Sequence, residues 1–83
     1  MRMTYDPEAD AAYIYVVDKI GPGEAKITRT WDDKKINATI AFDLSEDGKL
    51  LGIEIIPGAN ILSKKVLAKA KLLLPRKRRR AAK

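Results

Sequence analysis

Short apolar runs separated by polar turn residues dominate the first two thirds of the chain. The runs are rich in β-branched and aromatic residues, which favour strands. In residues 25–31 and 38–44 apolar and polar positions alternate, as in a strand with one covered face. Residues 12–17 are apolar at both parities, which predicts a central strand covered on both sides. Four or five strands are therefore expected, drawn from residues 1–5, 12–17, 25–31, 38–44 and 50–56.

The segments between these runs have the composition of tight turns and loops. Asp6 precedes Pro7 and can cap the amides of a turn, and Gly21-Pro22-Gly23 marks a longer loop. Asp47-Gly48 tolerates the positive φ that a hairpin connection requires. Because short connections reverse the chain, the sequence predicts an antiparallel sheet within residues 1–57.

From residue 61 onward the apolar spacing changes from two to about 3.6 residues, the period of an α-helix. Asn60 and Ser63 are candidate N-caps, and Pro75 ends the pattern. The expected fold class is therefore α+β, with an antiparallel sheet of four to five strands followed by one C-terminal amphipathic helix over residues 61–74. Residues 1–74 would form a single domain, and residues 75–83 a disordered basic tail.

The size of the chain, 83 residues, allows one domain and a modest core, since such a domain buries only about 60% of its unfolded surface. The absence of cysteine excludes disulfides and thiolate metal sites as a source of stability, so a homodimer is expected. Histidine, the commonest general base near neutral pH, is also absent, and no cofactor is expected. Apolar runs fall far short of the ~20 residues that cross a bilayer, which predicts a cytoplasmic protein without a membrane span.

The charge of the chain is unevenly distributed. Residues 1–63 hold all 11 acidic residues and seven basic ones, whereas residues 64–83 hold ten basic residues and no acidic one. This many cations cannot serve a packed core, so they face solvent or an anion. We expect them to contact nucleic acid or an acidic protein, the alternative being a solvated extension. The candidate contacts are Lys64, Lys65, Lys69, Lys71, Arg76, Lys77, Arg78, Arg79 and Arg80.

The acidic residues around the expected hairpin have the spacing of a calcium-binding loop. Asp43, Ser45 and Asp47 alternate before Gly48, and Glu54 falls at position twelve of the same count, as in an EF-hand. An EF-hand has a helix on each side of the loop, whereas the flanking segments here are strand-like. A plain hairpin turn with solvated acids is therefore the expectation, with a metal site at Asp43, Ser45, Asp47 and Glu54 as the alternative.

A second acidic cluster consists of Asp6, Glu8 and Asp10. Carboxylates at this spacing could hold Mg²⁺ or act as a general acid and base. No nucleophile motif or phosphate loop accompanies them, so capping of a turn is the simpler interpretation.

The aromatic residues offer a further alternative. Tyr5, Tyr13, Tyr15 and Trp31 could form a platform on which nucleic-acid bases stack. Aromatic residues in the strands of a small sheet more often belong to the core or to a dimer interface.

Two segments resemble a known family. Residues 3–14 read MTYDPEADAAYI, and residues 42–55 read FDLSEDGKLLGIEI. Together, and in this order, they resemble the small prokaryotic family called domain of unknown function 2283, and the similarity covers most of residues 1–60. The resemblance implies the sheet and the hairpin at Asp47-Gly48, argues against the calcium loop, and implies no activity or catalytic residue. The interval between Tyr15 and Asn37 is longer than is usual in the family.

Three classes of function follow from these features. The first is a non-enzymatic binding or interaction protein, homodimeric, whose basic tail contacts nucleic acid or another acidic partner. The second is a structural or assembly protein whose helix and tail dock on a partner protein. The third is an enzyme that uses carboxylates among Asp6, Glu8, Asp10 and Glu54.

Overall fold

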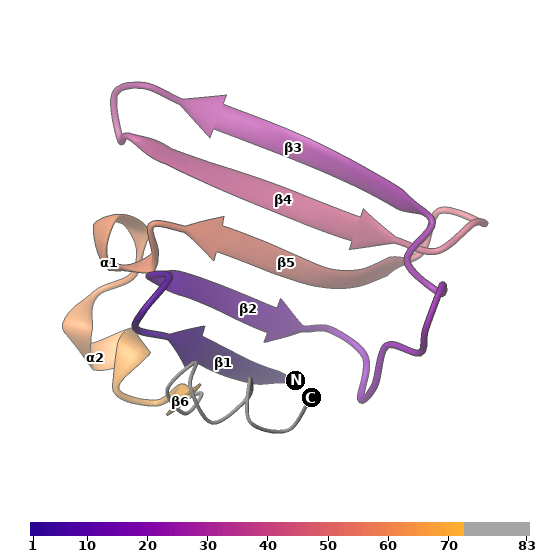
Figure 1. The fold of residues 1–83 in the computed structure, drawn as a ribbon, viewed down its shortest axis with the longest axis horizontal. Helices are drawn as coiled ribbons and strands as arrows, with labels where there is room; N and C mark the ends of the chain where they lie inside the picture. Colours follow the sequence, from indigo (N-terminus) through magenta and orange to yellow (C-terminus); the bar gives the residue numbers. More distant parts are fainter. Residues whose placement is uncertain (73–83) are drawn as a thin grey trace.

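Five of the six strands form where the apolar runs predict them. The computed structural model describes residues 1–72, which make one sheet with two short helices at its end (Figure 1). Strand β2 has β5 and β1 as neighbours, so the predicted central position of this segment is confirmed. The predicted cover on both sides is wrong for residues 1–72, because Ala12 is the only buried residue of β2. The sheet order is β3-β4-β5-β2-β1-β6, built from β1 (Arg2–Asp6), β2 (Ala11–Tyr15), β3 (Ile27–Asp33), β4 (Ala38–Leu44), β5 (Leu50–Ile56) and β6 (Lys71–Leu72).

The turns use the residues that the sequence marks for them. The carboxylate of Asp6 accepts hydrogen bonds from the backbone N–H groups of Glu8 (3.0 Å) and Ala9 (3.4 Å), which orders the turn between β1 and β2. Gly48 has φ +83° in the turn between β4 and β5, where an L side chain would be strained. These two turns place β1 against β2 and β4 against β5 in antiparallel pairs.

The prediction of one C-terminal helix over residues 61–74 is wrong. Two four-residue helices, α1 (Gly58–Ile61) and α2 (Lys64–Leu67), are followed by the strand β6. Ser63 is extended and its side-chain oxygen accepts a hydrogen bond from the N–H of Val66, so it starts a new helix rather than continuing α1. The apolar 3.6-residue spacing is therefore divided among two helices and a strand, while residues 73–83, including the predicted tail, lie outside the described part.

The sheet is mixed rather than purely antiparallel. Strand β6 pairs in parallel with β1, with Thr4 opposite Lys71 and Tyr5 opposite Leu72, whereas the other pairs are antiparallel. This short strand hydrogen-bonds to part of the outer edge of β1. The N–H and C=O groups of that edge would otherwise lack backbone partners. The sequence offers little sign of this strand, because two residues are too few to show an alternating pattern.

The register places side chains of opposite character on the two faces of the sheet. Cross-strand partners share a face, and alternate residues along a strand share it too. We call one side the apolar face; its members are Met3, Tyr5, Ala12, Ile14, Ile27, Arg29, Trp31, Asp33, Ala38, Ile40, Phe42, Leu44, Ile53 and Ile55. We call the other side the polar face; its members are Arg2, Thr4, Asp6, Ala11, Tyr13, Tyr15, Thr28, Thr30, Asp32, Thr39, Ala41, Asp43, Gly52, Glu54 and Ile56.

Neither helix lies across the apolar face. Figure 1 shows α1 and α2 beyond one end of the sheet, near the end of β5 and the start of β2. Among the described residues, α1 covers the corner next to it: a Cβ added to Gly58 would lie 3.0 Å from the Tyr5 ring and 3.5 Å from the Ala12 side chain. The core within residues 1–72 is accordingly thin, with Ala12, Leu51 and Ile55 buried and no large side chain completely enclosed.

Candidate functional site

A hydrogen-bonded cluster crosses the polar face between strands that are not neighbours. The hydroxyl of Tyr13 on β2 donates to Asp43 on β4 at 2.7 Å, and the hydroxyl of Thr28 on β3 donates to the same carboxylate at 2.8 Å. The Tyr13 side chain therefore reaches over β5, the strand that separates β2 from β4. Burial and the hydrogen bond to Asp43 raise the pKa of Tyr13. The hydroxyl of Tyr13 is therefore held in its neutral form, as a hydrogen-bond donor to Asp43.

Gly52 makes this crossing possible. A Cβ at position 52 would lie 2.5 Å from ring carbons of Tyr13, so any other residue would displace the ring. On the far side of Tyr13, the Tyr15 ring packs edge-on with the centroids 4.7 Å apart, and the Arg2 guanidinium lies 3.7 Å from the Tyr15 centroid. Sequence reasoning missed this cluster, although a glycine inside a strand is a known sign of a close approach.

The four candidate calcium ligands are not brought together as a loop. Asp43 accepts hydrogen bonds from Tyr13 and Thr28. The hydroxyl of Ser45 donates a hydrogen bond to Asp47 within the turn. Glu54 lies within β5, opposite Tyr13. Strand pairing draws Glu54 away from the turn. In residues 1–72 no group of three or more acidic, histidine or cysteine side chains is placed to hold a metal ion.

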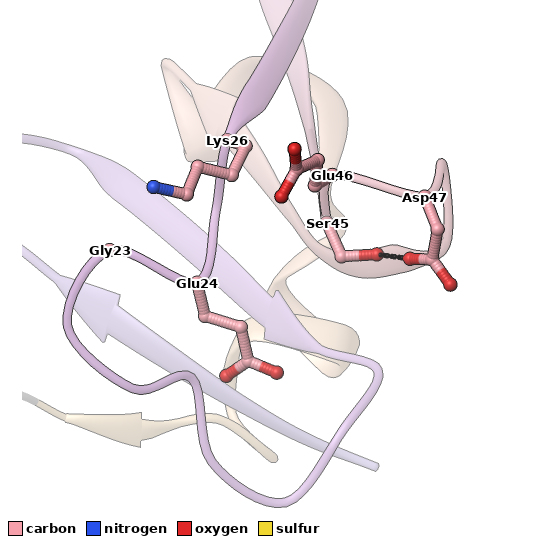
Figure 2. A pocket seen from close by; sticks show the side chains of 6 residues that line it. All are labelled: Gly23, Glu24, Lys26, Ser45, Glu46 and Asp47. Atoms are coloured by element: carbon pink, nitrogen blue, oxygen red, sulfur yellow. Dashed lines mark hydrogen bonds between the residues drawn. The ribbon is translucent and has the colours of Figure 1, made fainter.

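The turn that carries Ser45 and Asp47 borders an open hollow of about 590 Å³ (Figure 2). Glu24 and Lys26 line the other side, and Figure 2 shows the carboxylates pointing in different directions rather than toward one centre. One oxygen of Glu24 already accepts a hydrogen bond from the N–H of Gly21 at 2.8 Å. The hollow therefore lacks the convergent polar groups of a small-molecule site.

The acidic cluster near the N-terminus shapes the turn between β1 and β2. Asp6 is buried and accepts from backbone N–H groups of the turn, and Asp10 accepts from the Tyr5 hydroxyl (2.5 Å) and from the N–H of Ala59 (3.1 Å). The hydrogen bond to Asp10 raises the pKa of Tyr5. Asp6 and Glu54 both line a hollow of about 230 Å³ on the polar face, and Glu8 is exposed at the turn.

The four aromatic residues do not form one platform. Tyr13 and Tyr15 lie on the polar face, whereas Tyr5 and Trp31 lie on the apolar face, opposite Ala12 and Ile40 respectively. Stacking of bases across all four rings is therefore excluded by the register.

The four described lysines among the predicted anion contacts lie near one edge of the sheet. Lys64 and Lys65 belong to α2, Lys71 belongs to β6, and Lys69 lies between these elements; all four side chains are exposed. Figure 1 shows β6 beside β1 and α2 beyond the end of β1, at one corner of the sheet. The other candidates, Arg76, Lys77, Arg78, Arg79 and Arg80, lie outside the described residues.

The apolar face has no second layer within the described residues. Ile14, Phe42 and Ile53 are cross-strand neighbours at the middle of the sheet, yet each is only half-buried. Trp31 on β3 is 48% exposed. Amphipathic sheets normally bury such a face against a second layer. Within residues 1–72 no helix is long and apolar enough to cross a membrane.

Comparisons with known proteins agree with the resemblance in residues 3–14 and 42–55. The chain is 33% identical over 70 residues to the uncharacterized protein YuzE of Bacillus subtilis (strain 168), in an alignment covering 84% of this chain and 51% of the relative. The chain thus spans about half the length of that protein. No solved structure matches the present chain. The profile of the family described as protein of unknown function (DUF2283) matches residues 2–56, from the start of β1 to the end of β5. The chain therefore belongs to the DUF2283 family.

Proposed function

We propose that this protein is a non-enzymatic interaction module that assembles with another protein surface through its apolar face. The observation that carries the proposal is the half-exposed centre of that face, where Ile14, Phe42 and Ile53 lie side by side without a second layer. Contiguous exposed apolar patches of this kind mark interaction sites in soluble proteins.

The polar face supports the same proposal by contrast. Its central side chains are already engaged with one another, as in the Tyr13–Asp43–Thr28 cluster, so few of them are left to bind a ligand. The side chains of the apolar face cannot satisfy one another through hydrogen bonds in this way. They can be removed from water only by packing against another surface. Trp31, an aromatic residue of the type that dominates interface energetics, is exposed there.

Binding of an environment-sensitive apolar dye tests the proposal. Dilute, monomeric protein should bind the dye, and Trp31→Lys should weaken binding several-fold because it places a charge on the apolar face. Thr30→Lys is the matched control, since Thr30 is the exposed neighbour on the same strand but on the polar face. A monomeric sample that binds no dye, or equal weakening by both substitutions, would contradict the proposal.

A second candidate function is contact with nucleic acid along the edge formed by α2 and β6. The observation in its favour is that Lys64, Lys65, Lys69 and Lys71 are all exposed there, in a stretch from residue 55 to 83 that contains no acidic residue. Such contacts would be made with phosphates and would not read base sequence.

The salt dependence of oligonucleotide binding tests this second function. The double variant Lys69→Gln/Lys71→Gln should bind more weakly, and the slope of log affinity against log salt should fall by about 0.7–0.9 for each phosphate that the variant no longer neutralises. Lys34→Gln/Lys35→Gln, which removes two exposed charges from the turn between β3 and β4, should leave the slope unchanged. Absence of binding at low salt, or equal effects of the two pairs, would rule this function out.

A further inference from the structure

We infer that a second copy of this chain covers the apolar face, so that two sheets pack face to face as a homodimeric sandwich. The inference rests on the proposed function and names its partner. In this arrangement Ile53 and its cross-strand neighbours Ile14 and Phe42 lie at the centre of the interface. Stacked sheets lie about 10 Å apart, with the side chains of the two inner faces interdigitated.

Residues 73–83 are a poor candidate for the cover. Only residues 73–83 lie outside the described part, and six of these eleven residues are lysine or arginine. The other five are Leu73, Leu74, Pro75, Ala81 and Ala82, of which only the two leucines are large and apolar. Burying the intervening cations against an apolar sheet would carry a high desolvation cost. Another molecule is therefore a better candidate for the cover than residues 73–83.

The size and composition of the face favour a second copy as that molecule. The described chain measures 38 by 33 Å in its two longer dimensions, so its broad side can supply the roughly 800 Å² per partner of a stable interface. Of the residues that define the apolar face, only Arg29 and Asp33 are charged, and their charges are opposite. An interface with so few charges resembles a domain core cut in half, which is typical of obligate homodimers.

In a symmetric dimer the same apolar face is used on both copies, so no different partner protein is needed to supply a matching surface. About a twofold axis through the middle of the face, each apolar residue meets an equally apolar environment on its partner. The helices do not obstruct this approach, because α1 and α2 stand beyond the end of the sheet (Figure 1). A second copy also completes the core of a domain in which no large side chain of residues 1–72 is fully enclosed.

Sedimentation equilibrium of the full chain tests the inference. The wild-type protein and Thr30→Lys should sediment as dimers at micromolar concentrations. Trp31→Lys and Phe42→Asp should raise the dimer dissociation constant at least tenfold; Trp31→Lys alters an exposed side chain, so it keeps the test valid if Phe42→Asp fails to fold. Acrylamide quenching of Trp31, the only tryptophan, should increase as wild-type protein is diluted.

The outcomes separate this inference from the proposed function. A wild-type dimer that Trp31→Lys and a folded Phe42→Asp leave intact would show that the copies meet elsewhere, which overturns the inference. A wild-type monomer that binds the apolar dye also overturns it, but leaves the proposed function standing with a different protein as partner. A wild-type monomer that binds no dye overturns both.

Discussion

Replacing Gly52 with alanine is expected to lower the free energy of unfolding by about 1–3 kcal/mol, the usual cost of overpacking a site. The new Cβ would lie 2.5 Å from ring carbons of Tyr13, and the ring would have to leave its place over β5. The displaced ring would no longer donate its hydrogen bond to Asp43 or pack edge-on against Tyr15. Without this clash, alanine would be better than glycine in a strand by roughly 0.5–1 kcal/mol.

A double-mutant cycle isolates the clash from other effects. In the Tyr13→Ala background the Gly52→Ala substitution should cost nothing, because no ring remains over position 52. Gly21→Ala is the matched control, since its added Cβ would come no closer than 3.7 Å to a neighbour and its φ is not positive. Urea unfolding at one fixed protein concentration gives all the values. An equal cost of Gly52→Ala in both backgrounds would show that the Tyr13 crossing is not the cause.

The sequence predicts strands β1 to β5 well because each of these strands carries its own signal. The alternation in residues 38–44 and the apolar run at 12–17 are local patterns, and the strands β4 and β2 form there. The helix predicted over residues 61–74 is wrong for a reason that is also local. Ser63 is a candidate cap by its residue type, and a cap in the middle of a periodic segment divides it.

The candidate surfaces are harder to predict because they depend on register. Tyr13 and Asp43 are 30 residues apart, and they meet only because β5 lies between β2 and β4 and carries Gly52 at the crossing. Alternation alone also predicts that one face of the sheet is covered, but it does not say by what. With the predicted helix replaced by α1 and α2 at the end of the sheet, the apolar face is left uncovered by residues 1–72.

Replacing Asp10 with alanine is expected to lower the free energy of unfolding by about 2–4 kcal/mol. Asp10 has φ +52°, a conformation that costs an ordinary L residue roughly 1–2 kcal/mol but that aspartate and asparagine tolerate. Its side chain accepts hydrogen bonds from the Tyr5 hydroxyl and the N–H of Ala59, each contributing about 1 kcal/mol. The backbone carbonyl of Asp10 also accepts from the N–H of Gly58 at 2.7 Å, so this residue ties the β1–β2 turn to α1.

Two further substitutions at the same position divide this loss between backbone and side chain. Asp10→Asn keeps an acceptor oxygen and tolerates the positive φ, so it should remain within about 1 kcal/mol of the wild type. Asp10→Gly removes the acceptor but relieves the backbone, so it should fall between the asparagine and alanine variants. Chemical denaturation at a fixed protein concentration measures all three. If alanine and asparagine were equally tolerated, the Asp10 side chain would not link the turn to α1, and the acidic segment would again be open to a role outside the fold.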